Sequence, residues 1–97
     1  MIVSFKNQAT EDIFNGQTTK LARKICPVSL MSIALRKLDQ LDSVKALEEL
    51  RIPPGNKLEA LAGDRKGQWS IRVNNQHRIC FWWSENGPED VEFTDYH

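Results

Sequence analysis

The sequence predicts an α+β domain, with an N-terminal strand and helices packed on one face of a twisted antiparallel sheet. Two observations predict this class. Residues 28–50 carry apolar side chains at three- and four-residue steps, which is helical spacing, whereas residues 57–96 form short alternating runs separated by turn-forming residues. With 97 residues, of which 40% are hydrophobic and 27% charged, the chain is expected to fold as one domain over residues 1–97.

The N-terminal region is expected to contain one strand and one brief helix. Residues 2–5 are short and apolar without a helical period, which is typical of a strand. Thr10 is a candidate N-cap followed by two acids, and the helix is predicted to end at Asn15 and Gly16. The polar and basic residues 17–27 are interpreted as a mobile loop.

A longer helix is predicted to begin at Pro27 or Ser29, because an apolar stripe follows. The stripe consists of Leu30, Ile33, Ala34, Leu38 and Leu41. Ser43 is then expected to cap a second helix. The apolar residues of that helix are Val44, Leu47 and Leu50. The Pro-Pro-Gly sequence at residues 53–55 ends the helical region, since proline removes a backbone donor.

Four strands are predicted in the remainder of the chain. They span residues 57–61, 68–73, 77–83 and 90–96. The turns between them are rich in glycine, asparagine or proline, at residues 63–67, 74–75 and 85–88. Short turns join the last three strands, so these form an antiparallel meander, and the helices that precede them cover one face.

Alternation sorts the strand residues onto two faces. The face toward the helices is expected to consist of Ile71, Val73, Ile79, Phe81, Val91 and Phe93. The opposite face is expected to carry Ser70, Arg72, Arg78, Cys80, Trp82, Glu92, Thr94 and Tyr96. Such a face can bind an anionic backbone and stack a base on Trp82, and it can equally consist of solvated residues whose arginines pair with Glu92. Both interpretations stay open at this point.

Three other large side chains of this region are placed by residue type and position. Trp69 and Trp83 are assigned to the core, and His77 to the surface.

Composition excludes several classes of protein. The formal net charge is zero, but residues 17–38 hold five Lys or Arg and no acid, whereas residues 83–97 hold five acids and no Lys or Arg. No apolar stretch is long enough to span a membrane, and the N-terminus is not a signal peptide. Cys26 and Cys80 lie in no metal-binding spacing, so they are expected to be reduced thiols in a cytoplasmic protein. The sequence contains no Gly-rich phosphate loop, no HExxH motif and no nucleophile elbow.

Three segments together resemble one toxin family. They are KLEALAGDRKGQWSIRV at residues 57–73, NQHRICF at residues 75–81, and the terminal DYH. The chain is similar to the HigB branch of the RelE/ParE superfamily, whose members are also called plasmid maintenance system killer proteins. The resemblance implies the toxin of a type II toxin–antitoxin pair and a cytoplasmic mRNA endoribonuclease that commonly acts in the ribosomal A site. It also implies a helix-turn-helix antitoxin (HigA-like), whose complex with the toxin represses their promoter.

The resemblance also suggests site residues. Arg78 matches the arginine of the family's central strand, and the terminal Asp95, Tyr96 and His97 match its C-terminal group. The sequence departs from the family at Glu59, where a histidine is common, and at Ala62, where a lysine is common. A Glu–Arg–His combination resembles the set used by YoeB, another RelE relative, so Glu59, Arg78 and His97 form the expected catalytic set. The residues expected to hold RNA are Arg65, Lys66, Arg72, Asp95 and Tyr96.

The implied reaction is attack of a ribose 2′-hydroxyl on the adjacent phosphate, which gives a cyclic phosphate and a free 5′-hydroxyl. It calls for no metal or cofactor, because the nucleophile belongs to the RNA. Glu59 is expected to act as base, Arg78 as phosphate clamp, and His97 as acid, kept protonated by the adjacent terminal carboxylate. Two alternatives are a catalytically degenerate binding protein with the same fold and a ParE-like gyrase poison.

Overall fold

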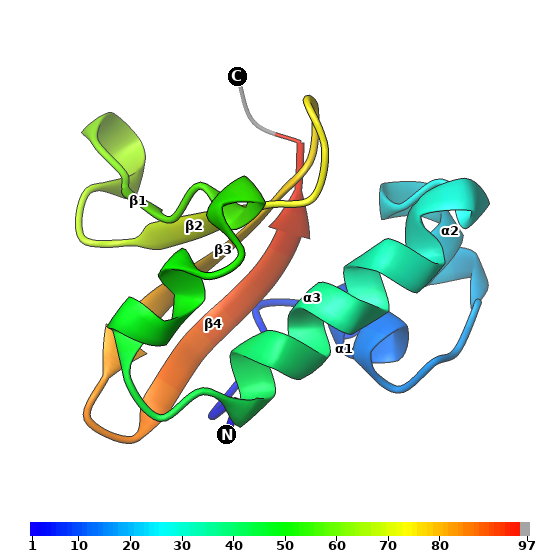
Figure 1. Ribbon diagram of the computed structural model, residues 1–97. Helices are drawn as coiled ribbons and strands as arrows, with labels where there is room; N and C mark the ends of the chain where they lie inside the picture. The colour runs from blue at the N-terminus through cyan, green and yellow to red at the C-terminus, as the bar shows by residue number, and fades with distance from the viewer. Residues whose placement is uncertain (96–97) are drawn as a thin grey trace.

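Helices on one face of a four-stranded antiparallel sheet make up the fold of the computed structural model, which describes residues 1–95 (Figure 1). In the ribbon, α3 and the neighbouring helical turns lie in front of the sheet, and α1 and α2 lie to the right of it, on the side of β4. The predicted α+β class, with its helical layer on one side, is confirmed. No helix within this part of the chain is long and apolar enough to cross a membrane.

The helical layer begins earlier than the sequence predicts. Helix α1 spans Gln8–Phe14, and its N-cap is Asn7, whose side chain accepts a hydrogen bond from the Thr10 backbone N–H. The predicted cap, Thr10, is instead buried, and its hydroxyl oxygen accepts a hydrogen bond of 3.1 Å from the Phe93 backbone N–H. The expected end at Asn15 and Gly16 is confirmed.

The interpretation of residues 17–27 as a loop is wrong, because they contain helix α2, Lys20–Ile25. The Thr19 side chain caps this helix by accepting a hydrogen bond from the Ala22 backbone N–H. Ala22 within the helix and Cys26 at its C-cap are completely buried, so one face of a short, basic helix packs into the core. Because so few residues of this segment are buried, the sequence shows no clear helical pattern of apolar residues.

The predicted long helix is confirmed as α3, Met31–Ser43, preceded by a 3-10 turn at Val28–Leu30. Ser43 is its last residue rather than the cap of a second helix. The second predicted helix is a 3-10 turn at Leu47–Arg51, where the Glu49 carboxylate accepts hydrogen bonds of 2.7 Å from the Lys45 and Ala46 backbone N–H groups. A further 3-10 turn at Pro54–Asn56 leads to the sheet.

The sheet contains β1 (Glu59–Ala60), β2 (Trp69–Arg72), β3 (Arg78–Ser84) and β4 (Gly87–Thr94), hydrogen-bonded in that order. All neighbours are antiparallel, as the meander prediction requires. A 3-10 turn at Gly63–Arg65 lies between β1 and β2. The register shifts between β3 and β4 near Cys80 and Trp82.

Residues 2–5 do not form the predicted strand. They run parallel to β4 but make only one isolated bridge, between Phe5 and Val91. Pro88 cannot donate a backbone hydrogen bond, and the Asp90 N–H is taken by the Ser4 hydroxyl at 2.9 Å. A regular ladder therefore does not extend along this edge.

The core lies between the sheet and the helices. The five strand residues Ile71, Ile79, Phe81, Val91 and Phe93 are at most 2% exposed, as alternation predicts, whereas Val73 is only half-buried. The surface assignment of His77 is wrong, because its ring stacks on Phe93 with the centroids 5.2 Å apart. Trp69 and Trp83 pack against the core without being fully buried. Both cysteines are free and buried.

Candidate functional site

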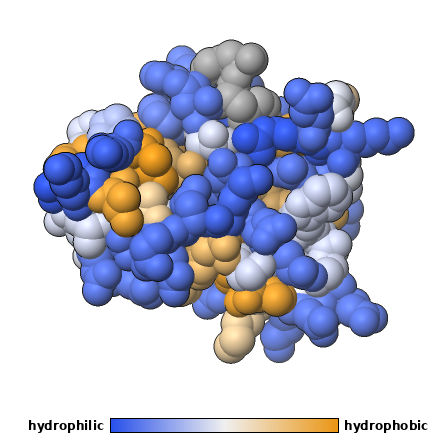
Figure 2. All heavy atoms as spheres, turned by 180° about the vertical axis from the view of Figure 1, so that it is seen from behind, coloured by the Kyte–Doolittle hydropathy of each residue, from blue (hydrophilic) through white to orange (hydrophobic). Residues whose placement is uncertain are grey.

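The face of the sheet turned away from the helices, called the open face here, carries two cross-strand rows of polar residues. One row is Glu59, Ser70, Cys80 and Glu92, and the other is Arg72, Arg78 and Thr94. Because paired residues in an antiparallel sheet point to the same side, the register places these side chains together. Figure 2 views the molecule from this side, where hydrophilic residues predominate.

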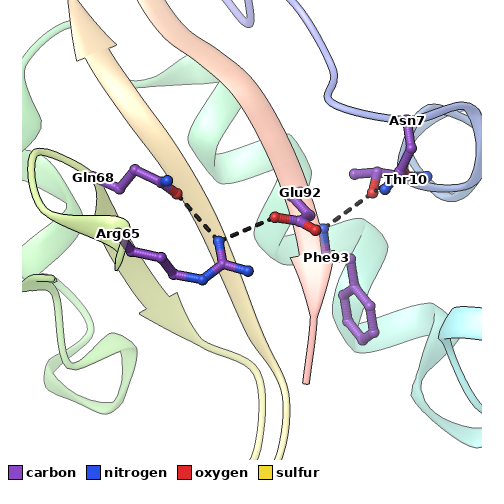
Figure 3. Close-up of polar contacts among 6 residues, drawn as sticks. All are labelled: Asn7, Thr10, Arg65, Gln68, Glu92 and Phe93. Atoms are coloured by element: carbon purple, nitrogen blue, oxygen red, sulfur yellow. Dashed lines mark hydrogen bonds and ion pairs between the residues drawn. The ribbon is translucent and has the colours of Figure 1, made fainter. Parts of the chain in front are cut away.

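Arg65 covers the middle of the open face. Its Nη1 donates hydrogen bonds to Gln68 Oε1 at 3.3 Å and to Glu92 Oε1 at 3.1 Å, so the guanidinium reaches from the turn before β2 to β4 (Figure 3). The side chains of Arg65 and Glu92 are 26% and 16% exposed. The possibility that Arg72 and Arg78 pair with Glu92 is therefore wrong, since Arg65 holds that carboxylate.

The turn that carries Arg65 lies against Trp82. Gly67 has φ +98°, and a Cβ at this position would lie 2.5 Å from the Trp82 ring, so only glycine allows this approach. Trp82 is 42% exposed, which confirms the prediction from alternation. Lys66, expected to hold RNA, is exposed on the same turn.

Cys80 lies in the same row as Glu92 and is completely buried. Burial raises the pKa of its thiol to about 11, and the nearby Arg65 and Arg78 oppose that rise. A thiol with this pKa is protonated near neutral pH, so Cys80 is not suited to be a nucleophile.

Arg72 and Arg78 lie directly opposite each other on β2 and β3, and both are half-exposed. Arg78 Nη1 donates to the backbone carbonyl oxygens of Asn74 and His77, the latter at 3.1 Å, and Arg72 Nη2 donates to Asn75 Oδ1. Across residues 1–95, neither arginine forms a salt bridge. Two like charges placed opposite each other are destabilising without a counter-charge, so this pair is suited to binding an anion.

Glu59 is exposed on β1 and shares the open face with these arginines, because it pairs with Ser70. Two strand spacings, about 10 Å, separate the backbones of β1 and β3. Glu59 lies level with Cys80, two residues along β3 from Arg78, so the two residues share a face without being cross-strand neighbours, and they do not form an ion pair with each other.

The chain end predicted to complete the site is described only as far as Asp95. The Asp95 carboxylate accepts a hydrogen bond of 2.7 Å from Gln76 Nε2, which ties the end of β4 to the hairpin that also contacts Arg78. The expected site residues Tyr96 and His97 lie outside the described residues. In the described part of the chain, no three His, Cys, Asp or Glu side chains are grouped in a way that could hold a metal ion.

Sequence reasoning missed the neutral residues that position these arginines. Gln68 contacts Arg65, while Asn74 and Asn75 contact Arg78 and Arg72. From the sequence, both asparagines are expected only to form a turn. The Asn74 side chain also accepts hydrogen bonds from the Gln76 and His77 backbone N–H groups. Asparagine often forms such local bonds to the backbone in turns, so the residue type at position 74 is the sequence signal that could have indicated this role.

Known proteins match both the sequence and the fold. Residues 3–97 match the sequence profile of a family described as "RelE-like toxin of type II toxin-antitoxin system HigB". Toxin HigB-1 of Vibrio cholerae is 40% identical over 83 residues, which are 86% of this chain and 84% of that protein. Endoribonuclease HigB of Proteus vulgaris is 30% identical over 97 residues, which are 100% of both chains.

Two solved structures share the fold. The YoeB–YefM complex from Staphylococcus aureus matches 100% of this chain and 95% of that chain, with a TM-score of 0.56 and 21% identity. The YoeB/ParE toxin from Agrobacterium tumefaciens matches 99% of this chain and 98% of that chain, with a TM-score of 0.54 and 18% identity. The profile match over nearly the whole sequence and the two curated relatives agree with the resemblance predicted from the sequence. The chain therefore belongs to the HigB family of RelE-like toxins of type II toxin–antitoxin systems, and its class of partner is an antitoxin.

Proposed function

We propose that this toxin is an endoribonuclease that cleaves mRNA on the ribosome by attack of a 2′-hydroxyl on the adjacent phosphate. The observation that carries the proposal is the pair formed by Arg72 and Arg78, two guanidinium groups opposite each other with no carboxylate partner in residues 1–95. The name of the Proteus vulgaris relative, Endoribonuclease HigB, supports the same activity.

Arg78 binds the phosphate whose bond is cleaved. Its guanidinium presents several N–H donors in a fixed plane and stays charged at any working pH, so it stabilises the negative charge that grows on the phosphoryl oxygens. The hydrogen bonds from Nη1 to two carbonyl oxygens hold one side of the group and leave its remaining donors for the substrate. Arg72, directly opposite, holds a neighbouring phosphate of the same strand.

Glu59 acts as the general base. It is an exposed carboxylate on the same face as Arg78, and it takes the proton from the 2′-hydroxyl as that oxygen attacks phosphorus. His97 donates a proton to the departing 5′-oxygen, and Tyr96 and Asp95 help to hold the RNA. These last roles come from the match of the terminal Asp-Tyr-His to the family.

Arg65 and Lys66 hold the RNA by its phosphates, as expected from the sequence. The ion pair of Arg65 with Glu92 places its guanidinium along the sheet, so we propose that Arg65 also shapes the surface on which RNA lies, while Lys66 is exposed. The proposed partners are a helix-turn-helix antitoxin that represses the shared promoter with this toxin, and the ribosome with its message in the cytoplasm.

Substitution of Arg78 tests this function. Arg78→Ala should lower message cleavage by about 10²–10³-fold, the usual cost of losing one charge-stabilising donor, and should relieve growth arrest. Cleavage is measured by primer extension after induction, and folding by circular dichroism. Arg36→Ala is the matched control, because Arg36 is an exposed arginine on α3.

Three outcomes contradict the proposal. Wild-type cleavage by an Arg78→Ala, His97→Ala double variant would exclude the assigned residues. Growth arrest with all transcripts intact would indicate a binding protein without catalysis. Broken or relaxed plasmid DNA with intact message would indicate a gyrase poison.

A further inference from the structure

A cavity outside the open face lies on the other side of β4. It has a volume of about 490 Å³ and lies between the end of β4, the hairpin before β3 and the C-terminal part of α2. Its charged and aromatic lining includes Arg23, Lys24, His77, Glu92 and Asp95. The volume is within the range of pockets that bind small ligands.

The two carboxylates that line this cavity are already engaged. Glu92 forms the ion pair with Arg65, and Asp95 accepts a hydrogen bond from Gln76. Arg23 donates to a neutral acceptor, the Thr18 carbonyl oxygen, and Lys24 is exposed. Over residues 1–95, neither of these two cations has an ion-pair partner. Positive charge is therefore concentrated at the α2 side of the cavity, while Asp95 keeps its negative charge at the β4 side.

The remaining wall of the cavity is partly apolar. Ile25 and Pro27 line the α2 side. On the sheet side, His77 and Phe93 form a stacked pair in which both rings are almost fully buried, so the wall is fixed in place. The two cations on α2 are therefore the groups through which this cavity can bind an RNA strand, by its phosphates.

The cavity is continuous with the open face. Glu92 and Thr94 belong to the open face and also line the cavity, and Thr94 pairs directly with Arg78. One strand spacing separates Arg78 from Thr94, and the cavity begins beyond β4, so roughly 10 Å separates it from the β3 backbone. An RNA strand whose phosphate is bound at Arg78 reaches the cavity with its next nucleotides.

We propose that this cavity is a second RNA-binding subsite, in which Arg23 and Lys24 bind a phosphate of the cleaved strand next to the scissile bond. The proposal rests on the endoribonuclease function and adds a specific contact on α2 to it. The subsite is assigned to binding rather than to the chemical step, because its cations come from α2, whereas the proposed clamp of the scissile phosphate, Arg78, lies on β3.

The test compares two variants of the same helix. Arg23→Ala, Lys24→Ala removes the proposed phosphate-binding cations, and Lys20→Ala removes a cation of α2 that does not line the cavity. Binding of 2′-O-methyl oligoribonucleotides, which cannot be cleaved, is measured by fluorescence anisotropy over a series of lengths and salt concentrations. Antitoxin binding is measured for the same proteins.

The double variant should bind longer oligonucleotides about tenfold more weakly than wild type and should bind the shortest ones equally well. The slope of its log affinity against log salt concentration should be shallower by about 0.7 for each phosphate that the protein no longer neutralises. Lys20→Ala should stay within about twofold of wild type, because a single exposed cation outside the cavity supplies only screened attraction.

The results that would overturn the subsite differ from those that would overturn the endoribonuclease function. If wild type cleaves message but the double variant binds RNA as Lys20→Ala does, the subsite is excluded while the function stands. Loss of antitoxin binding with unchanged RNA binding would assign the cavity to protein docking and overturn the proposal. Weaker binding to ribosomes that carry no message would assign the two cations to ribosomal RNA and overturn it also. If wild type cleaves no message at all, the proposed function itself fails.

Discussion

The two faces of the sheet are built from the same strands, yet they exclude water in different ways. On the helix side, Ile79 and Phe81 are completely buried by apolar packing. On the open face, the alternate residue Cys80 is equally buried, but it shares its face with the charged pair Arg65 and Glu92. Packing thus stabilises one face, whereas a surface ion pair shapes the other, and substitutions of neighbouring residues should separate stability from RNA binding.

The largest expected difference is between two adjacent residues of β3. Phe81→Ala should lower the free energy of unfolding by about 3–5 kcal/mol, because it leaves a cavity in the core, and this is a large part of the stability of a small domain. Trp82→Ala, on the open face, should lower it by about 1 kcal/mol or less. Urea denaturation of both variants measures the difference, and equal losses would show that the two faces contribute alike.

The pH dependence of stability should reveal the burial of one cysteine on each side of the sheet. Burial raises the pKa of both Cys26, on the helix side, and Cys80, on the open face, from 9.0 to about 11. Because each folded-state pKa lies above the unfolded value, the stability is fully present below about pH 9 and is lost as pH rises toward 11. With ~1.4 kcal/mol for each unit, the loss is on the order of 2 kcal/mol per thiol.

Chemical denaturation between pH 8 and pH 11 measures that loss. Cys26→Ala and Cys80→Ala should each show a smaller fall in stability with pH than wild type. The same slope in wild type and both variants would mean that other groups cause the fall.

Thr10 joins the helical layer to the sheet through one buried hydrogen bond. Thr10→Val keeps the shape but leaves the Phe93 backbone N–H without its acceptor, so the unfolding free energy should fall by about 1–3 kcal/mol. Thr18→Val is the control, since Thr18 is exposed. Under conditions in which the Thr10→Val variant is folded, it should still cleave message. A loss of cleavage in the folded variant would show that the helical layer and the sheet are coupled in function.

The sequence predicts well whatever depends on local patterns. The periodicity of α3 and the alternation along β2 and β3 locate the core and the open face correctly, because both patterns repeat over many residues. The Arg72 and Arg78 pair follows from that alternation. Helix α2 is missed because Ala22 is the one buried residue within it and lies in a basic run, and the next buried residue, Cys26, is already the C-cap.

The interactions that shape the site join residues far apart in the chain. Arg65 and Glu92 are 27 positions apart, and no local pattern decides which arginine takes that carboxylate. The burial of His77 against Phe93 is equally non-local. Turn geometry decides both, since the turn after β1 brings Arg65 over the sheet and the hairpin at Asn74 turns His77 inward.

The smallest expected effect is that of Glu92→Gln, which removes the charge but keeps the size of the side chain. Because both partners are partly exposed, the unfolding free energy should fall by only about 1 kcal/mol. Arg65 then keeps its hydrogen bond to Gln68 but no longer faces the Glu92 carboxylate, so its charge attracts phosphate more strongly. We therefore expect RNA to bind slightly more tightly, and with a steeper salt dependence, than in wild type.

Glu85→Gln is the matched control for charge, because Glu85 lies exposed at the β3–β4 turn, away from Arg65. It should raise RNA affinity less than Glu92→Gln does. Equal gains from both variants would show that net charge alone, rather than the loss of the ion pair between Arg65 and Glu92, controls binding. A large loss of stability in Glu92→Gln would show instead that the ion pair supports the open face as strongly as apolar packing supports the other.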